Sequence, residues 1–307
     1  MGQNKSETRN KMMHFYPGRD SNFNYIAIPF RNILLHGTVK ATRSSLLQHM
    51  IIRTIQEQLP SNLKFLIFDA DNIVSNLYIS LMGDGREIAH IEKVEKVKDD
   101  DDTLTTAVKY LDDIKEVIAS NTITKVVVIT GVDRIVKNSL SEPGRVREFY
   151  NILKKRLTEA RAHNVCFLVD FGPAEIPDDV INCFGIKMCI KTTSTTMAHS
   201  LIGSDVAVYN TDDSCYVWIQ GEKGEPFRLF VPRQPEKWNK RVLKAFSNTK
   251  DEQAKNTTVE TVDDVEEKAE ESVGEPPIVP DIEEETPIEE NTENEVQEGE
   301  SAEASEE

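Results

Sequence analysis

The sequence predicts an α/β protein with a mainly parallel sheet and flanking helices. Short apolar runs alternate with stretches of helical periodicity between residues 24 and 246, which is typical of strand–helix units. Runs such as Val126-Val127-Val128-Ile129 are apolar at every position, as interior parallel strands are. A glycine-containing segment at residues 37–44 separates an early strand from a helix, as a phosphate-binding loop would.

The elements follow from local patterns taken in chain order. Predicted strands are short apolar runs bounded by turn residues, and they span residues 25–28, 32–36, 63–68, 125–130, 165–169, 185–190, 215–219 and 227–231. Predicted helices span residues 44–59, 104–119 and 145–163, where apolar residues recur at helical spacing. Asp102 or Thr103 is the expected cap of the second helix. The segment Gly221-Glu222-Lys223-Gly224 predicts a hairpin turn between the last two strands.

Charge divides the chain into a body and a tail. Residues 251–307 contain 23 acidic and 2 basic residues, a net charge of -21, so the other 250 residues carry about +4 of the total of -17. The tail has no aromatic residue and four prolines, and it cannot bury enough apolar surface to offset its chain entropy. We expect a flexible N-terminus at residues 1–17, an α/β domain at 18–246 and a disordered acidic tail at 247–307.

Cysteine content and hydropathy predict a soluble, cytoplasmic protein. The cysteines Cys166, Cys183, Cys189 and Cys215 are widely spaced, without zinc or thioredoxin spacing, so we expect four reduced, buried thiols. No apolar run approaches the roughly 20 residues of a membrane span, and no secretory signal opens the chain. Residues 1–6 fit both a frayed polar start and the pattern for lipidation at Gly2.

The segment at residues 37–44 keeps the frame of a phosphate-binding loop and loses two of its residues. Such a loop requires Gly, four free positions, and then Gly-Lys-Ser/Thr. Gly37 and Ser44 stand in register, but the second glycine is Thr42 and the lysine is Arg43. A side chain at Thr42 obstructs close backbone approach to a phosphate, and a guanidinium does not replace a lysine ammonium. Weak binding of a nucleotide or sulfate at the helix N-terminus stays open. The candidate nucleotide-binding residues are Gly37, Thr38, Thr42, Arg43, Ser44 and Ser45.

Read together, these segments resemble the motor domain of the FtsK/SpoIIIE DNA translocases over residues 18–232. Residues 18–31 are similar to the lead-in of that family, and residues 32–45 to its first strand and phosphate loop. The next strand of the family, which ends in an aspartate, corresponds to Phe65-Leu66-Ile67-Phe68-Asp69. Its Walker B strand corresponds to Lys125-Val126-Val127-Val128-Ile129, and its later strands to residues 160–169, 186–207 and 225–229. The resemblance implies a RecA-like P-loop NTPase fold.

The departures from the family lie where nucleotide chemistry would occur. The two acids that follow the Walker B strand are replaced by Thr130 and Gly131. Asp133 is either a substitute for them or a helix-capping or surface acid, and the second interpretation is favoured. The sensor sequence Thr-Gln-Arg-Pro is replaced by Asp170-Phe171-Gly172-Pro173, and a later basic residue falls on His199. Phosphoryl transfer depends on positioned charge, so we expect turnover near background and no catalytic residue.

Three functions are compatible with this resemblance. The favoured one is a non-hydrolysing structural, regulatory or partner-binding module of a DNA-translocation, conjugation or secretion system. The second is an active ATP-dependent DNA translocase or coupling protein, which would need ATP and a Mg²⁺ ion at Ser44. The third is an acidic tail that mimics DNA charge.

Two basic stretches are candidates for contact with DNA or a partner. One comprises Lys154, Lys155, Arg156 and Arg161, and the other has Lys237, Lys240, Arg241 and Lys244 around Trp238. Charge pattern alone favours solvated helix faces for both. The resemblance implies an intact FtsK-like or coupling ATPase, or a further copy of this chain, as partner.

Overall fold

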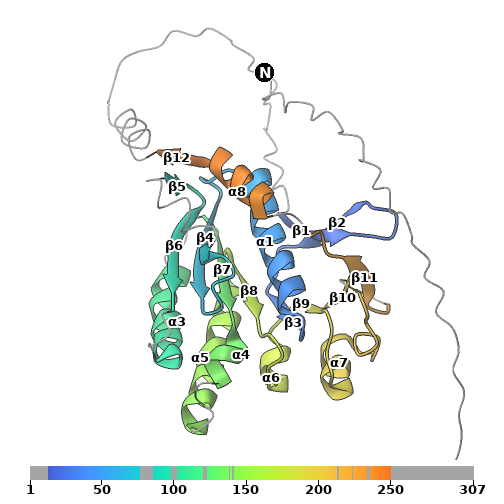
Figure 1. Ribbon diagram of the computed structural model, residues 1–307. Helices are drawn as coiled ribbons and strands as arrows, with labels where there is room; N and C mark the ends of the chain where they lie inside the picture. Colours follow the sequence, from blue (N-terminus) through green and yellow to red (C-terminus); the bar gives the residue numbers. More distant parts are fainter. Residues whose placement is uncertain are drawn as a thin grey trace, which may run out of the picture. The chain divides into compact units, whose positions relative to one another are not determined.

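A ten-stranded mixed sheet forms the centre of the protein (Figure 1). The computed structural model describes residues 13–76, 86–97, 102–119, 123–137, 139, 142–212, 214–222, 224–233 and 236–249. The strand order is β2-β1-β11-β10-β9-β3-β8-β7-β4-β6. The strands from β9 to β6 in this order are parallel, whereas β10, β11, β1 and β2 pair antiparallel in succession.

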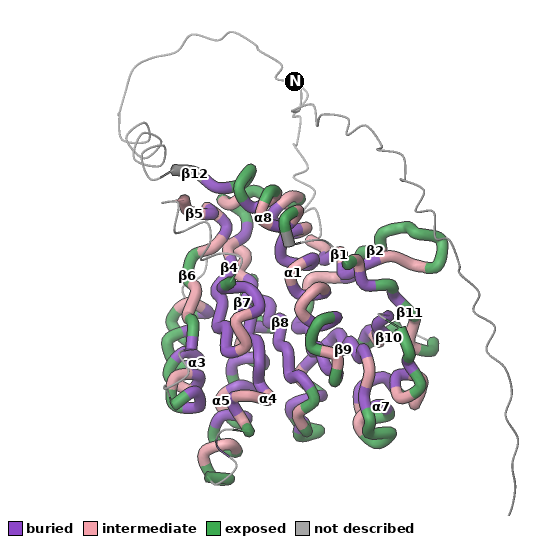
Figure 2. The backbone as a smooth tube through the Cα atoms, in the orientation of Figure 1, coloured by how far each residue is buried: buried purple, intermediate pink, exposed green. Residues whose placement is uncertain are grey.

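Eight strands of the large sheet follow the apolar runs of the sequence, and β1 and β6 do not. In chain order the strands of the large sheet are β1 (His14–Arg19), β2 (Tyr25–Pro29), β3 (Ile33–His36), β4 (Leu63–Asp69), β6 (Ile91–Lys96), β7 (Thr124–Thr130), β8 (Val165–Asp170), β9 (Ile186–Cys189), β10 (Ser214–Ile219) and β11 (Phe227–Phe230). A separate pair is formed by β5 (Arg86–Ile88) and β12 (Ser247–Thr249). Every residue of β3 and β8 is buried, because these strands lie in the middle of the sheet with both faces covered (Figure 2).

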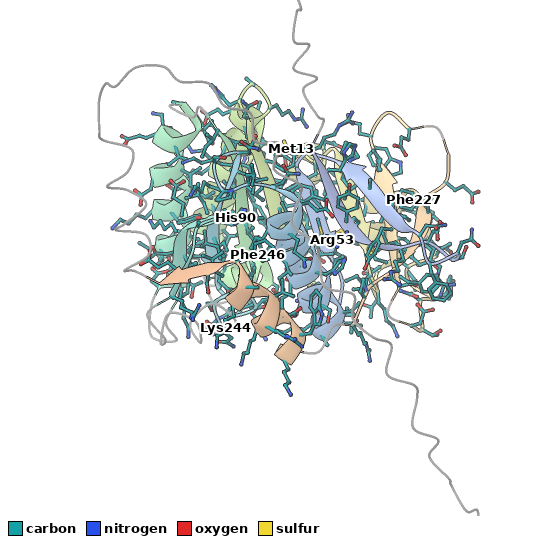
Figure 3. All side chains as sticks on the ribbon, turned by 90° about the horizontal axis from the view of Figure 1, so that it is seen from above. Met13, Arg53, His90, Phe227, Lys244 and Phe246 are labelled. Carbon is teal, nitrogen blue, oxygen red and sulfur yellow. The ribbon has the colours of Figure 1, made fainter. Side chains whose placement is uncertain are left out.

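Helices cover both faces of the sheet. One face packs against α1 (Lys40–Glu57) and α8 (Glu236–Ala245), which lie beside each other (Figure 3). The other face packs against α3 (Thr103–Ala119), α4 (Val132–Lys137), α5 (Pro143–Ala160), α6 (Asp178–Ile181) and α7 (Thr195–Ile202). Each face has its own cluster of fully buried side chains, for example Leu46 and Met50 of α1, and Phe149 and Leu153 of α5. The predicted α/β class with a mainly parallel sheet is confirmed.

Most predicted elements are present, with shifted ends. Each of the eight predicted strands lies within one residue of an observed strand at either end. The second predicted helix is α3, and its N-terminus is capped by Asp102, whose Oδ1 accepts the Thr105 N–H at 3.1 Å. The predicted helix at 145–163 is α5, which begins and ends earlier. The predicted helix at 44–59 begins four residues earlier, at Lys40, and this difference changes the candidate site.

The first strand was not predicted, because Pro17 and Gly18 break its apolar pattern. β1 begins at His14, inside the segment expected to be flexible, and Phe15 is fully buried. Its pairing with β2 is irregular between Phe15 and Gly18, a position where a strand tolerates proline. A Cβ at Gly18 would lie 2.3 Å from the Phe230 carbonyl oxygen, so only glycine allows β1 to pair with β11.

The remaining sequence predictions concern the ends of the chain, the thiols and membranes. β12 lies in the range assigned to the acidic tail, whose other residues, like residues 1–12, are outside the described ranges. All four cysteines are free thiols; three are buried and Cys183 is half-buried. Among the helices that the structure describes, none has the length and apolar composition needed to cross a bilayer.

Candidate functional site

The candidate site lies at the carboxyl ends of β3, β4, β7 and β8. In open α/β sheets this edge is where ligands bind. The chain leaves β3 at Gly37, and α1 begins only three residues later, after Val39. Val39 is the N-cap residue and makes no side-chain capping bond, so no capping residue in the sequence indicates a helix start here. Arg43 and Ser44 therefore lie within the helix and do not line an open loop.

Two backbone N–H groups of the short loop already donate hydrogen bonds within the protein. The Gly37 N–H donates to the Gly172 carbonyl at 3.0 Å, and the Thr38 N–H donates to the Lys191 carbonyl at 2.7 Å. A Cβ at Gly37 would lie 3.0 Å from Ile190 Cβ, so the loop is packed directly on the end of β9. These two N–H groups thus hold the loop to its neighbours.

Arg43 is buried, with a side-chain exposure of 2%, and it is held by the protein itself. Its Nε donates to Asp170 Oδ1 at 2.8 Å, and its Nη1 donates to the Gly37 carbonyl at 2.6 Å. Its Nη2 lies 4.0 Å from Asp71 Oδ2. The positive charge at the lysine position of the loop is therefore neutralised by an aspartate that stands in place of the sensor sequence.

Asp170 is completely buried at the end of β8. Its Oδ1 also accepts the Gly172 N–H at 2.9 Å, while its Oδ2 has no hydrogen-bond partner among the described residues. Burial raises the pKa of Asp170 to about 6, and the charge of Arg43 opposes that rise. At neutral pH the carboxylate is charged and pairs with Arg43.

Two more carboxylates surround Arg43. Asp71 contacts Lys40, whose Nζ lies 3.2 Å from its Oδ1. Asp133 is half-buried in the first turn of α4, and its Oδ1 is buried and lacks a hydrogen-bond partner in the described part of the chain. Burial raises the pKa of Asp133, and the charge of Asp71 adds to this effect. Asp133 thus lies at the N-terminus of α4, where the favoured interpretation as a helix-capping acid places it, and it is half-buried beside Asp71 and Arg43.

The residues at the Walker B acid positions have structural roles. Thr130 Oγ1 donates to Asp69 Oδ1 at 2.6 Å. Asp69 also accepts the N–H groups of Ile73, Val74 and Ser75, so this carboxylate holds the turn after β4. Gly131 has φ +67°, and a Cβ there would lie 2.9 Å from Asp71 Cγ. No side chain fits at that position without strain.

The other predicted site residues are close to this cluster but are not joined into a nucleotide site. Thr42 is buried, Ser44 and Ser45 are half-buried in the first turns of α1, and Thr38 is exposed. His36 is buried at the end of β3, and burial together with Arg43 lowers its pKa to about 4. Within the described ranges, no group of three or more His, Cys, Asp or Glu side chains is arranged to hold a metal ion.

The first basic stretch is only partly a surface. Arg156 is buried, with 3% exposure, because its Nε donates to the Leu111 carbonyl and its Nη2 to Asp112, both on α3. The prediction that Arg156 contacts DNA or a partner is therefore wrong. Lys154 forms an ion pair with Asp179, and Lys155 is exposed. Arg161 follows α5 and donates to the Asn182 carbonyl at 3.2 Å.

The second basic stretch lies on α8. Its apolar side, with Trp238, Val242 and Leu243, packs on the core formed by α1. Asn239 Nδ2 donates to Gln48 Oε1 at 3.2 Å, which joins α8 to α1. The exposed side of α8 carries Lys237, Arg241 and Lys244. This arrangement is that of a solvated amphipathic helix.

Comparison with known proteins relates the fold to ATPases. No protein-family model and no curated protein sequence matches this chain. The cytoplasmic domain of the type VII secretion ATPase EccC from Thermomonospora curvata aligns with 77% of this chain and 31% of its own length, at 12% identity and a TM-score of 0.54. ATPases 2 and 3 of EssC from Geobacillus thermodenitrificans align with 76% of this chain and 48% of their own length, at 16% identity and a TM-score of 0.54. The pCW3 conjugation coupling protein TcpA, in a monomer form with ATPγS, aligns with 80% of this chain and 73% of its own length, at 10% identity and a TM-score of 0.51.

These matches show that the chain has the fold of FtsK/SpoIIIE-type P-loop ATPase domains, as the sequence resemblance implied. The chain spans 31% and 48% of the length of the EccC and EssC structures. At identities of 10–16% the likeness concerns the fold.

Two features of the site could not be found from the sequence. The pairing of Arg43 with Asp170 joins residues 127 positions apart. Its one signal in the sequence is that the loop lysine and the sensor sequence are both replaced. The place of Asp71 beside Lys40 and Gly131 follows from the turn after β4, for which the sequence gives no pattern.

Proposed function

We propose that this chain is a P-loop-fold module that does not hydrolyse nucleotide and serves as a structural or regulatory component of a DNA-translocation, conjugation or secretion machine. The observation that carries this proposal is the buried pair of Arg43 and Asp170, at 2.8 Å. In this pair, the carboxylate of Asp170 binds the guanidinium of Arg43, which is the buried cation of the phosphate-binding segment.

A nucleotide phosphate at this edge would meet unfavourable electrostatics. It would have to displace Asp170 from Arg43, and it would then lie near Asp71 and Asp133, which both carry carboxylates. Like charges at such short range in a partly desolvated site repel strongly. Lys40 is the exposed cation of the cluster, and it already pairs with Asp71. The electrostatic balance supports a site closed to phosphate.

Hydrolysis is opposed by the backbone as well as by the missing acids. Thr130 is committed to Asp69, and Gly131 has neither the φ nor the space for an acidic side chain. The loss of a single positioned group typically lowers an enzymatic rate by about 10²- to 10³-fold, although such losses are not additive. We therefore expect turnover near background.

A role as a partner of an active ATPase fits these properties best. The solved structures of similar fold are ATPases of type VII secretion and a conjugation coupling protein. A domain of the same fold without its own chemistry can occupy a subunit position and fix its neighbour's geometry. The exposed cations of α5, Arg147 and Lys155, form the surface that we assign to this contact. Lys154 contributes less, because Asp179 neutralises it.

A phosphate-release assay with the purified chain, with and without duplex DNA, tests the loss of hydrolysis. We expect no DNA-stimulated turnover. A rate above about 1 s⁻¹, at the low end of ordinary enzymes, would overturn the proposal if Ser44→Ala abolishes it. A rate unchanged by Ser44→Ala belongs to a contaminating enzyme.

Co-expression with an intact FtsK-like or coupling ATPase from the same genetic neighbourhood tests the partner role. We expect both chains to elute together in size-exclusion chromatography. Arg147→Glu with Lys155→Glu should weaken the complex, because charges at the rim of an interface steer association. Lys109→Glu, which reverses an exposed charge on α3, is the matched control. Elution of this chain as a lone monomer beside the ATPase would contradict this role.

A further inference from the structure

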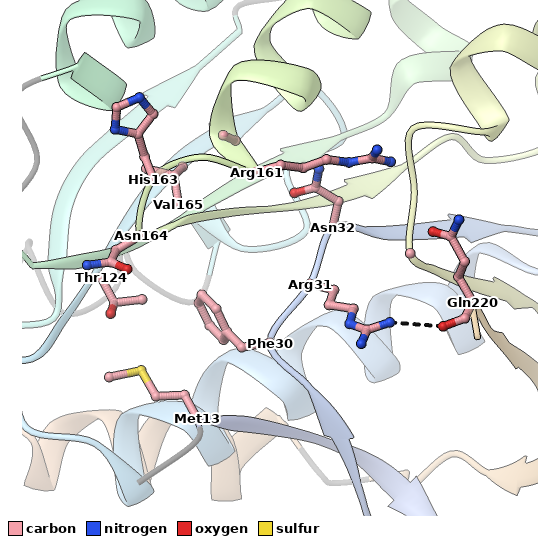
Figure 4. A pocket seen from close by; sticks show the side chains of 12 residues that line it. Met13, Phe30, Arg31, Asn32, Thr124, Arg161, His163, Asn164, Val165 and Gln220 are labelled. Carbon is pink, nitrogen blue, oxygen red and sulfur yellow. Dashed lines mark hydrogen bonds between the residues drawn. The ribbon is translucent and has the colours of Figure 1, made fainter. Parts of the chain in front are cut away.

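A second cavity lies at the opposite edge of the sheet from the Arg43 cluster. It has a volume of about 630 Å³ and is lined by the residues that open β3, β7, β8 and β9, including Asn32, Thr124, Val165 and Gly185 (Figure 4). The six residues of β8 separate the two edges by roughly 16 Å at 3.3 Å per step. The cavity is therefore distinct from the candidate nucleotide site, and its size is within the range of small-molecule sites.

The lining of this cavity is cationic. Arg31 and Arg161 line it, and among the described residues that line it none is an aspartate or glutamate. An anion entering the cavity therefore meets no carboxylate from this described lining, in contrast to the Arg43 cluster at the other edge. Charge complementarity thus points to an anionic ligand.

Both guanidinium groups are held in place and keep free donors. Arg31 Nη1 donates to the Gln220 carbonyl at 2.9 Å, and Arg161 Nη2 donates to the Asn182 carbonyl at 3.2 Å. Each contact uses one of the five N–H donors of an arginine. Arg31 lies against Gly185, where a Cβ would come within 3.1 Å of Arg31 Cδ. Anchored guanidiniums bind phosphate in a bidentate manner at low entropic cost.

One wall of the cavity is flat and apolar. Phe30 lies directly above Met13 in Figure 4. The Phe30 ring is stacked on Phe15, with centroids 4.9 Å apart and an interplanar angle of 17°, and Phe15 is fully buried. A ring fixed in this way offers a platform for a planar group. Stacking of a base on an aromatic side chain contributes favourable energy for any base.

We propose that this cavity binds a nucleoside phosphate, with the phosphate on Arg31 and Arg161 and the base against Phe30. The proposal does not depend on the function proposed above. The same chemistry is offered by a free nucleotide and by the phosphorylated end of a single strand of nucleic acid.

Calorimetric titration of the full chain with AMP, ADP, adenosine, inorganic phosphate and a 5′-phosphorylated oligothymidylate tests the proposal. We expect AMP and ADP to bind with a Kd below about 1 mM, and adenosine and inorganic phosphate to bind at least tenfold more weakly. Tighter binding of the oligonucleotide than of AMP identifies a strand end as the natural ligand, and equal or weaker binding identifies a free nucleotide. No binding of any nucleoside phosphate, or equal binding of inorganic phosphate, would overturn the proposal.

Substitutions in the wall locate the ligand. Arg31→Gln and Arg161→Gln should each weaken AMP about tenfold, since each removes charge-assisted hydrogen bonds. Phe30→Leu should weaken AMP while leaving the weak binding of inorganic phosphate unchanged. The matched control, Lys109→Gln, removes an exposed charge on α3 outside the cavity and should not change binding. Equal affinity of all four variants would refute the assignment.

Photo-crosslinking with an azido-AMP followed by peptide mapping separates this site from the other edge. We expect label within residues 28–32 or 160–165. Label within residues 37–45 would overturn the cavity assignment and would also show that the Arg43 cluster admits nucleotide. Absence of label in both places would refute the cavity site. If the same chain also shows no hydrolysis, the function proposed above is unaffected.

Discussion

Removal of the Arg43 side chain should destabilise the protein strongly, in a manner that depends on pH. In Arg43→Met the carboxylate of Asp170 loses its charge partner while it stays fully buried. Breaking a buried pair by deleting one partner costs about 3–5 kcal/mol, because an uncompensated charge is left in the interior. The Gly37 carbonyl also loses its donor at 2.6 Å. We expect a loss of this size in the free energy of unfolding at pH 8.

The sign of the pH dependence follows from the pKa of Asp170. Its folded value of about 6 lies above the unfolded value of about 3.9, so its contribution to stability is fully present at low pH and is lost as pH rises through about 6. Without Arg43 the folded pKa rises further, and the buried carboxyl stays protonated to higher pH. The destabilisation by Arg43→Met should therefore be smaller at pH 5 than at pH 8.

Urea unfolding of Arg43→Met, Asp170→Asn and the double variant at both pH values provides the measurement. The double variant should be more stable than the sum of the single losses predicts, because each single change leaves an unpaired group that the other removes. A loss below about 1 kcal/mol for Arg43→Met at pH 8, or additive losses in the double variant, would refute the account of a buried, coupled pair.

Two further predictions concern residues outside this pair. Gly131→Glu returns an acid to the Walker B position. It should lower the free energy of unfolding by about 1–3 kcal/mol and leave hydrolysis absent, because residue 131 has a φ of +67° and Asp71 occupies the space that a side chain would need. A gain of ATPase activity would contradict this prediction. Arg156→Ala should lower the free energy of unfolding, measured in urea, by about 1–3 kcal/mol, since it removes hydrogen bonds from α5 to α3. The control Lys155→Ala, at the exposed neighbouring position, should change it by less than about 0.5 kcal/mol. Equal effects would show that Arg156 has no structural role.

The sequence predicted the sheet well because its strands carry local signals. The run from Val126 to Ile129 is buried on both faces, and such a run has few alternatives to an interior strand. β1 was not predicted because its proline and glycine are accommodated by an irregular pairing and a close strand contact, which depend on partners distant in the sequence. The start of α1 at Lys40 was missed because Val39 is not a capping residue.

The candidate site was predicted in position and only partly in chemistry. Its position was indicated by four residues that depart from local motifs of the family, namely Thr42, Arg43, Thr130 and Gly131. The partners of these residues come from other strands: Asp170 from β8, and Asp69 from β4. A single sequence does not show such pairs, because the contacts form only when the sheet is assembled.

The early start of α1 and the bonding of the loop to Gly172 and Lys191 have a consequence for how this edge responds to its surroundings. A phosphate loop that closes on a ligand gains stability in proportion to the logarithm of ligand concentration, so its conformation follows the supply of that ligand. Here the anion opposite Arg43 is a residue of the same chain, present at every moment and at a fixed position. Under the proposed function, this edge of the sheet should therefore keep one geometry at high and at low ATP concentration. A neighbouring ATPase subunit would then contact a surface that stays the same while that subunit binds and hydrolyses ATP.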